Sequence, residues 1–307
     1  MKSKIFISTI PFASSNKSPL ELLEKHNIDY EINDLGRKIT ENELFNKIKD
    51  FDALIAGTEP ITKRVLNNAP KLKVISRVGV GVDNIDIEYA SKKDISIRTS
   101  SEGPVTAVAE YTLGLILSML RHIHVANHSM KQGVWKKEIG HDLFNSVVGV
   151  VGAGNIGSKV IQLLSAFMPK KIIYYDPFIK KEIPNASKVD LKELLTQSDV
   201  VTLHLPLSKS TNAMISLPEI KCMKKNAILV NTARGGIIKE EDLYVALKER
   251  LIAGSAIDVF ENEPYKGKLL ELENCLISPH MAPMTKNARE SMELDAVKQA
   301  LEFISCQ

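Results

Sequence analysis

The stretch VVGVVGAGNIGSKVIQLL at residues 147–164 decides the fold. An apolar run of strand length comes first, and a segment with the apolar spacing of a helix follows it. Between the two, Gly152 permits a tight turn, Gly154 lets a pyrophosphate approach the backbone, and Gly157 lets the helix pack closely on the strand. The helix N-terminus then directs its amides at the phosphates. In this context the glycine turn predicts a dinucleotide-binding site rather than a structural turn alone.

A carboxylate at the end of the next apolar run indicates which dinucleotide binds. Asp176 follows KIIYY about 20 residues after Gly157, where a carboxylate accepts hydrogen bonds from the adenosine ribose hydroxyls. The same charge repels a ribose 2′-phosphate, and Pro177 provides no basic partner for one. We therefore expect NAD rather than NADP. Lys180 and Lys181 lie nearby and could weaken this preference, although a solvated surface patch is the simpler interpretation of them.

Apolar runs of strand length recur along the whole chain, with helical segments between them. The runs are KIFISTI, FDALIAG, LKVISRVG, VVGVVGAG, KIIYYD, DVVTLHLP, AILVNTA, AGSAIDV and CLISPH. Strands that alternate with helices predict parallel sheets in α/β domains. Capping patterns at residues 40–43 and 190–193 support two of the helices.

Two long helical segments indicate how the domains are divided. Residues 106–128 form a long apolar segment without proline, which suits a buried helix that crosses between domains. Residues 286–304 would carry the chain back onto the first domain. We therefore expect two Rossmann-like, doubly wound α/β domains with parallel sheets, residues 1–101 with 282–307 and residues 102–281, with cofactor and substrate in the cleft between them.

The composition favours a protein that acts on small molecules. The chain has 307 residues, 44% of them hydrophobic, enough for two domains with sizeable cores. Its 40 basic and 37 acidic residues, a formal charge of +3, are dispersed, so we expect neither nucleic acid nor a membrane as partner. No apolar run approaches the roughly 20 residues of a membrane span, and Pro11 ends the first apolar stretch too early for a signal peptide.

The cysteines and histidines point neither to disulfides nor to a metal. Cys222, Cys275 and Cys306 are odd in number and form no C-x-x-C pair, so we expect a reducing, cytoplasmic location. His124 and His128 are spaced i, i+4, but no carboxylate or cysteine accompanies them in sequence. We therefore expect solvated or interface histidines and no metal site.

Three further segments each follow an apolar run: NTARGG at 231–236, DVFENEP at 258–264 and SPHMA at 278–282. Open α/β sheets build their sites at the carboxyl ends of strands. Taken singly, Arg234 could be a surface cation, Glu263 a loop carboxylate and His280 a histidine before a turn. Together they supply what hydride delivery to a keto carbon requires, a fixed cation and a proton donor beside a carboxylate that favours the imidazolium.

In this order and spacing, the glycine turn and the three segments resemble the D-2-hydroxyacid dehydrogenase family, which includes phosphoglycerate, glyoxylate/hydroxypyruvate and D-lactate dehydrogenases. The resemblance covers nearly the whole chain, including RVGVGVDNID at 77–86, AVAEYTLGLIL at 107–117 and KQGVW ending at Trp135. It implies an NAD-dependent oxidoreductase that moves a hydride between nicotinamide and a small D-2-hydroxy or 2-keto acid. Because relatives use the region around Trp135 for two-fold contacts, it also implies a homodimer.

The resemblance assigns roles to individual residues. Arg234 would hold the substrate carboxylate and keto oxygen, His280 would exchange the proton, and Glu263 would orient the imidazole. Substrate contacts would come from the backbone amides of Val80 and Gly81, with Arg77 as a nearby cation. The implied cofactor contacts are Gly152, Gly154, Asn155, Ile156, Gly157, Asp176, His204, Leu205, Pro206, Thr232, Ala233 and Asp258, the last of which would bind the nicotinamide carboxamide.

Two alternatives remain open at this point. One is a non-enzymatic NAD-sensing protein, because the family includes transcriptional corepressors on the same scaffold. The other is a formate- or phosphite-type dehydrogenase, although formate enzymes usually carry glutamine at the position of Glu263. Among the hydroxy acids, the sequence leaves the substrate open, including whether it is phosphorylated.

Overall fold

The computed structural model describes residues 2–100 and 103–305. The chain divides into two compact units, Met1–Pro104 with Met284–Gln307 (unit 1) and Val105–Pro283 (unit 2). The first boundary falls in the first turn of the long helix α5 (Gly103–Leu120).

Unit 1 is built on a five-stranded parallel sheet in the order β2-β1-β3-β4-β5. Its elements are β1 (Lys4–Ile7), α1 (Ser18–Lys25), β2 (Asp29–Ile32), α2 (Glu41–Lys47), η1 (Ile48–Asp50), β3 (Ala53–Ala56), α3 (Lys63–Asn67), β4 (Val74–Arg77), α4 (Ile87–Lys92), β5 (Ser96–Thr99) and α11 (Lys286–Ser305). The strand order reverses between β1 and β3, as in other doubly wound sheets. One apolar cluster joins the sheet to α2, α3 and α4, while α11 packs on β3, β4 and β5 and contacts α1.

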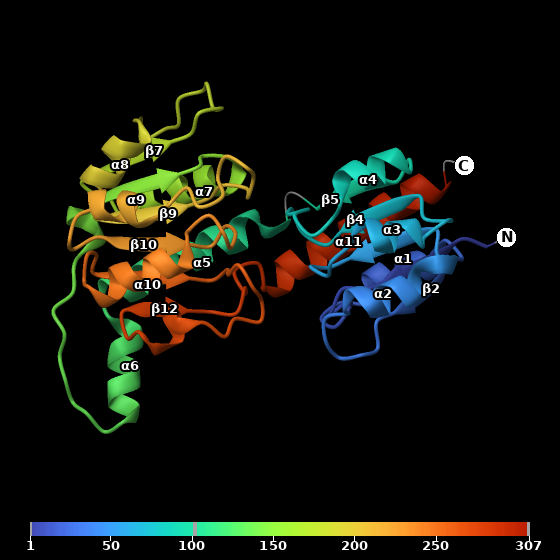
Figure 1. The fold of residues 1–307 in the computed structure, drawn as a ribbon, viewed down its shortest axis with the longest axis horizontal. Helices are drawn as coiled ribbons and strands as arrows, with labels where there is room; N and C mark the ends of the chain where they lie inside the picture. Colours follow the sequence, from blue (N-terminus) through green and yellow to red (C-terminus); the bar gives the residue numbers. More distant parts are fainter. Residues whose placement is uncertain (1, 101–102, 306–307) are drawn as a thin grey trace. The chain divides into compact units, whose positions relative to one another are not determined.

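Unit 2 is built on a seven-stranded parallel sheet in the order β12-β11-β10-β9-β6-β7-β8. After α5, its elements are α6 (Ile123–Lys131), η2 (Leu143–Asn145), β6 (Val147–Val151), α7 (Asn155–Ser165), β7 (Lys171–Tyr175), β8 (Ser187–Lys188), α8 (Leu191–Gln197), β9 (Val200–Leu203), α9 (Leu217–Cys222), β10 (Ile228–Asn231), α10 (Glu240–Lys248), β11 (Gly254–Ile257), η3 (Lys268–Glu271) and β12 (Cys275–Ile277). Figure 1 shows these elements in sequence colours.

Helices cover both faces of the unit 2 sheet. One apolar cluster joins α5 and α7 to β6, β7, β9, β10 and β11, and a second joins α8, α9 and α10 to the opposite face. Alternate residues of β6 supply the two clusters, since Val148 and Val150 belong to the first and Val151 to the second. The expected fold class, doubly wound α/β domains with parallel sheets, is confirmed for both units.

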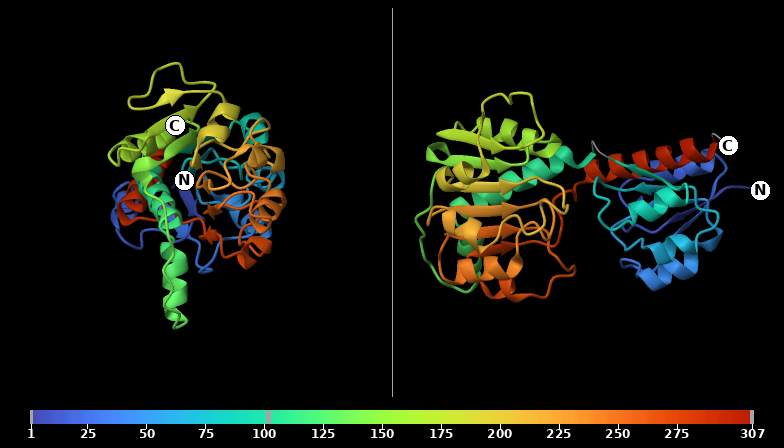
Figure 2. Two further views of the ribbon diagram at one scale, coloured as in Figure 1. Left: turned by 90° about the vertical axis from the view of Figure 1, so that its left-hand side faces the viewer. Right: turned by 45° about the horizontal axis from the view of Figure 1, so that its top comes forward.

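The end of the predicted helix at 106–128 was wrong. The helix α5 stops at Leu120, His122 has a left-handed backbone with φ 52°, and α6 begins at Ile123. No residue of α6 is buried, and the helix projects from the body of unit 2 (Figures 1 and 2). Apolar residues continue through both helices, so the sequence pattern alone did not reveal where the supporting sheet ends.

The helix α5 also comes closer to a membrane span than the sequence analysis allowed. It is long and apolar enough to cross a bilayer by length and composition, and half of it is buried inside the protein. Ile116 is completely buried in the cluster that covers the sheet, as expected for a core helix. The predicted helix at 286–304 and both predicted helix caps are present, with Thr40 and Glu43 forming a capping box and Asp190 accepting from the Glu193 amide at 2.7 Å.

Three strands were not expected from the sequence, and all three lie at sheet edges. They are β2, β5 and β8, whereas the inner strands β1, β3, β4, β6, β7, β9, β10 and β11 were all expected. The edge strands carry exposed or half-buried side chains, for example in β8, where both residues are exposed. A search for apolar runs finds strands that are buried on both faces, and at the sheet edges it found β12, whose residues CLI are apolar, but not β2, β5 and β8.

Candidate active site

The glycine turn stands at the point where the unit 2 strand order reverses. The chain leaves β6 toward β7 and β8 on one side, then returns to β9 on the other. Gly152 has φ +89°, a left-handed conformation suited to glycine, and a Cβ there would overlap the carbonyl of His204. A Cβ on Gly157 would overlap the carbonyl oxygen of Gly152, so the start of α7 packs directly on the turn.

Gly154 differs from its two neighbours in the motif. A Cβ at this position would meet no protein atom within 4 Å. It is the N-cap of α7, so the first amides of the helix behind it have no acceptor within the helix. The packing of the protein therefore does not require glycine here, whereas close approach of a phosphate to these amides would.

Asp176 ties the turn to the end of β7. Its Oδ2 accepts from the Ala153 amide at 2.9 Å, and its Oδ1 accepts from Phe178 at 2.8 Å and Ile179 at 3.1 Å. Burial would raise the pKa of Asp176, but the three amides and Lys188 outweigh it and hold the pKa below its usual value. A carboxylate offers about four acceptor positions. One position on Oδ2 therefore remains for a ribose hydroxyl.

His204 follows β9 and faces the same turn. Part of the residue reaches the surface, but its imidazole is enclosed, and burial lowers the pKa of His204 to about 3. Its Nε2 pairs with the Thr202 hydroxyl at 2.9 Å, while its buried Nδ1 has no hydrogen-bond partner in the protein. The neutral imidazole therefore packs inside the protein beside the glycine turn, and its unpaired Nδ1 is shielded from solvent.

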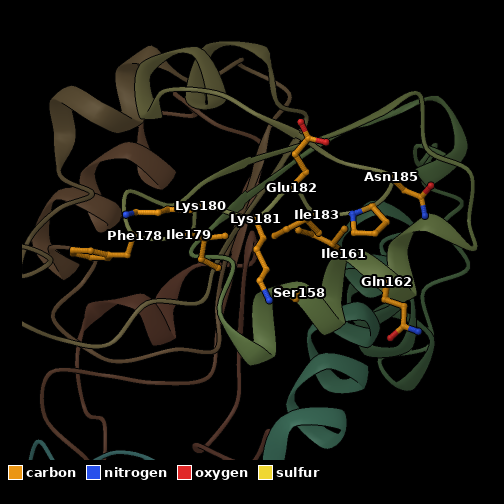
Figure 3. A pocket seen from close by; sticks show the side chains of 11 residues that line it. Ser158, Ile161, Gln162, Phe178, Ile179, Lys180, Lys181, Glu182, Ile183 and Asn185 are labelled. Carbon is orange, nitrogen blue, oxygen red and sulfur yellow. The ribbon is translucent and has the colours of Figure 1, made fainter.

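A cavity of about 850 Å³ lies beside the predicted cofactor site, between α7 and the loop after Asp176. Its lining includes Ser158, Ile161, Gln162, Lys181 and Ile183. Figure 3 shows the Lys181 side chain pointing toward Ser158, while Phe178 and Lys180 extend to the other side. None of the glycines of the turn and none of the predicted catalytic residues lines this cavity.

The three predicted catalytic segments follow three neighbouring strands, β10, β11 and β12. After β10, the Asn231 side chain builds the turn that presents Arg234, accepting from the Ala233 amide at 3.0 Å and donating to the Arg234 carbonyl at 2.9 Å. The Arg234 guanidinium is half-buried and donates to the Ala233 carbonyl at 2.6 Å. Thr232 is buried, with its hydroxyl 2.8 Å from that of Thr112 on α5.

Glu263 and His280 form a direct pair across the ends of β11 and β12. The His280 Nδ1 lies 2.9 and 3.1 Å from the two carboxylate oxygens, and both side chains are about 30% exposed. Because a carboxylate only accepts, Nδ1 carries the proton and Nε2 is left to exchange a proton with a ligand. The backbone of His280 has φ +51°, a strained conformation of the kind that clusters at functional sites.

Asp258 anchors the loop that carries His280. This buried carboxylate accepts from the Ser278 hydroxyl at 2.6 Å, the Met281 amide at 3.0 Å and the Ala282 amide at 2.9 Å. The Asp258 carbonyl also accepts from the His280 amide at 2.8 Å. Burial raises the pKa of Asp258 although these donors and His280 oppose it. Asp258 therefore holds the backbone of the loop that carries His280; its predicted contact with the nicotinamide carboxamide stays a prediction.

The other predicted cofactor residues occupy the same ends of the unit 2 strands. Asn155 and Ile156 form the first turn of α7, and Leu205 and Pro206 continue the chain after β9. Ala233 is buried beside Thr232.

In unit 1, the predicted substrate loop follows β4. Val80 is 43% exposed and Gly81 is half-buried, so both are accessible. Arg77 is buried, its guanidinium donates to the Val78 carbonyl, and it lies close beneath Gly79. This placement supports the loop from below; a direct contact of Arg77 with substrate stays a prediction.

The described residues contain no group of three His, Cys, Asp or Glu side chains that suits a metal ion. His124 is half-buried and His128 exposed. Burial lowers the pKa of His124. Cys222 and Cys275 are free thiols, while Cys306 lies outside the described residues.

Several residues that position the site rather than contact a ligand were not predicted from the sequence. Asn231, Gly235 and Ser278 belong to segments that the sequence analysis did quote, and Asn231 and Ser278 each bond the chain around a predicted catalytic residue. A Cβ on Gly235 would overlap the Phe260 carbonyl, so the Arg234 loop packs on the backbone near Glu263. Polar residues at a strand end, and a glycine next to a catalytic candidate, are the signals that point to them.

Comparison with known proteins identifies the family of the chain. Residues 113–282 match the family model described as "D-isomer specific 2-hydroxyacid dehydrogenase, NAD binding domain". A glyoxylate reductase from Thermococcus litoralis is 38% identical, with 99% of this chain and 94% of the relative covered. A D-3-phosphoglycerate dehydrogenase from Methanocaldococcus jannaschii is 44% identical over 82% of this chain, which spans only 50% of that relative. The crystal structure of a D-lactate dehydrogenase from Aquifex aeolicus, complexed with NAD and lactic acid, has a TM-score of 0.87 at 27% identity and covers 99% of this chain and 96% of its own.

Proposed function

Because the chain belongs to the D-isomer specific 2-hydroxyacid dehydrogenase family, we propose that it transfers a hydride between NAD(H) and the keto or hydroxyl carbon of a small D-2-hydroxy or 2-keto acid. The observation that carries this proposal is the contact between Glu263 and His280, which lie after β11 and β12. Arg234 lies after β10, the strand next to β11. These three side chains supply a cation, a proton donor and a carboxylate that orients the donor.

The cofactor lies along the strand ends of unit 2. The amides at the start of α7 bind the pyrophosphate, Gly154 leaves room for it, and Asp176 accepts from the adenosine ribose. The negative charge of Asp176 disfavours a ribose 2′-phosphate, so NAD is preferred over NADP. When bound, the nicotinamide supplies or accepts the hydride.

The protein holds and polarises the acid. Arg234 binds the substrate carboxylate and the keto oxygen, on which negative charge grows as the carbon is reduced. His280 donates the proton to that oxygen from Nε2 in reduction and removes it in oxidation, while Glu263 holds Nδ1. In unit 1, the amides of Val80 and Gly81 bind the carboxylate, with Arg77 fixing their loop.

Turnover of NADH by purified protein tests the proposal. The panel is glyoxylate, hydroxypyruvate, pyruvate, 2-ketoglutarate, branched 2-keto acids and phosphohydroxypyruvate, with D- and L-hydroxy acids compared in the reverse direction. His280→Ala is the control, expected to bind NADH and lose turnover because it lacks the proton donor. If the wild-type protein binds NADH but reduces no acid, the NAD-sensing alternative replaces this proposal. Oxidation of formate or phosphite alone would favour the other alternative.

We further propose a homodimer that forms through α6 and the segment after it. Several large apolar side chains of this region are exposed to solvent: Ile123 (56%), Met130 (52%), Val134 (51%), Trp135 (79%) and Ile139 (94%). Large exposed apolar patches mark interaction surfaces. Light scattering after gel filtration should give the dimer mass for the wild-type protein and the monomer mass for the double variant Trp135→Ser, Ile139→Ser. A wild-type monomer would reject the dimer.

We also propose that the protein acts in the cytoplasm on small molecules, without nucleic acid or membrane partners. The free thiols of Cys222 and Cys275 and the dispersed charges support this. Fractionation of cells should recover the protein with soluble cytoplasmic enzymes, and its presence in a membrane or secreted fraction would contradict the proposal.

A further inference from the structure

The turn that carries Glu263 is held by a second carboxylate, which the reaction described above does not use. Glu240, the first residue of α10, is half-buried, and its Oε1 accepts from the Glu261 amide at 2.7 Å. On the same turn, the Phe260 amide donates to the Glu263 carboxylate at 3.2 Å. Two successive amides of the turn are therefore bound by carboxylates, that of Phe260 by Glu263 and that of Glu261 by Glu240.

The segment from Arg234 to Glu240 touches this turn at two points. Near its start, Gly235 packs on the backbone of Phe260 so closely that a Cβ would overlap it. At its end, Glu240 bonds the next amide of the turn, that of Glu261. The segment that carries Arg234 and the turn that carries Glu263 are therefore packed against each other. The hydrogen bond from the Glu261 amide to Glu240 is the second contact that joins them.

The negative charge of Glu240 interacts with the charges of the turn. Burial raises the pKa of Glu240, the Glu261 amide opposes the rise, and the negative charges of Glu261 and Glu263 add to it. The charged and titratable groups around Glu240 are Lys239, Glu241 and Asp242 in its own segment, Glu261 and Glu263 on the turn, Tyr265 beyond the turn, and Lys268 on η3, which lies over the ring of Tyr244. The electrostatic coupling with Glu263 is mutual.

We propose that Glu240 is a positioning residue for the Glu263–His280 pair, because it anchors the turn through the Glu261 amide and adds negative charge that favours the imidazolium. The inference rests on the proposed function of the pair as the proton donor. Charge and anchoring make separable contributions. The anchor sets how often the imidazole is correctly placed, and the charge sets the pH range in which it carries the proton.

Two substitutions separate these contributions. Glu240→Gln keeps an oxygen that accepts from the Glu261 amide but removes the charge, whereas Glu240→Ala removes both. Glu241→Gln is the matched control, because the exposed Glu241 carries the same charge one residue further along α10. The readouts are the pH profile of kcat/KM for reduction, the affinity for NADH, and an NMR titration of the His280 ring.

In Glu240→Gln we expect the falling limb of the reduction profile to move to lower pH, because the variant removes a negative charge beside the turn that carries Glu263. At low pH its rate should stay within about twofold of wild type. Glu240→Ala should show the same displacement and a lower kcat at every pH. NADH affinity should be unchanged in all variants, and Glu241→Gln should match wild type throughout.

The inference is overturned if Glu240→Gln leaves both the profile and the His280 titration where they are in wild type. It is also overturned if Glu241→Gln moves them equally, since the effect would then be general surface charge. The NMR titration decides the question without turnover. A wild-type protein that reduces no 2-keto acid therefore rejects the proposed function, and the titration still accepts or rejects the role of Glu240 separately.

Discussion

Adding one methyl group to Gly154 or to Gly157 is expected to separate cofactor binding from folding. At Gly157 the new Cβ would overlap the carbonyl oxygen of Gly152 and lie 2.9 Å from its carbonyl carbon. These are backbone atoms that no rotamer change can move. Overpacking of this kind costs about 1–3 kcal/mol. A loss of about 2 kcal/mol corresponds to a fall in Tm of roughly 4–8 °C for a unit of this size.

At Gly154 the same methyl group would meet no protein atom within 4 Å. The residue has φ −66° and ψ −159°, a conformation at the margin of the extended region of alanine, with no left-handed φ to forbid a side chain. Alanine is a poorer N-cap than glycine by roughly 0.5–1 kcal/mol, and its smaller unfolded-state entropy returns about 0.4–1 kcal/mol. Stability should therefore change by less than about 0.5 kcal/mol. The methyl group would instead displace the pyrophosphate, and losing one charged hydrogen bond, about 1.5–3 kcal/mol, weakens NADH binding by roughly 10- to 100-fold.

Thermal unfolding followed by circular dichroism without cofactor, and NADH binding followed by fluorescence, measure the two effects separately. Gly114→Ala is the control, because Gly114 lies on the exposed side of α5, has open space at its Cβ, and should gain stability without any change in NADH affinity. Wild-type NADH affinity in Gly154→Ala, or wild-type stability in Gly157→Ala, would refute this division of roles.

Three further substitutions test the remaining parts of the site. Asp176→Ala should weaken NADH use more than NADPH use, measured as the ratio of kcat/KM values, and a wild-type preference for NADPH would contradict the assignment. Arg234→Lys keeps the charge but loses the forked geometry, so kcat/KM for the 2-keto acid should fall by an amount equivalent to about 2–4 kcal/mol with little change in NADH affinity. Near-normal efficiency would remove Arg234 from the mechanism. Asp258→Asn replaces one of the two oxygens that accept hydrogen bonds from the His280 loop. The free energy of unfolding, measured in urea, should fall by about 1–3 kcal/mol, and kcat should fall as well. Unchanged stability and kcat would mean that the His280 loop keeps its conformation without the Asp258 carboxylate.

Sequence reasoning predicted the inner strands and the motifs at their ends because both depend on local patterns. A strand covered by helices on both faces must be apolar throughout, as β3, β9 and β10 are. The glycine turn, Arg234, Glu263 and His280 lie in the segments that follow β6, β10, β11 and β12, so the parallel topology brings them to the same edge of the sheet. The assignment of a role to each residue depended on the family resemblance as well.

The tertiary structure alone decided three things. It added the edge strands β2, β5 and β8, which lack an apolar pattern because solvent covers one side of them. It ended α5 at Leu120, where support from the sheet ends although apolar residues continue. It also assigned the anchoring roles of Asp258 and Glu240, because their partners belong to other segments of the chain. Local patterns indicate buried strands and helices, but sheet edges, helix ends and hydrogen bonds between distant segments are decided only when the chain folds.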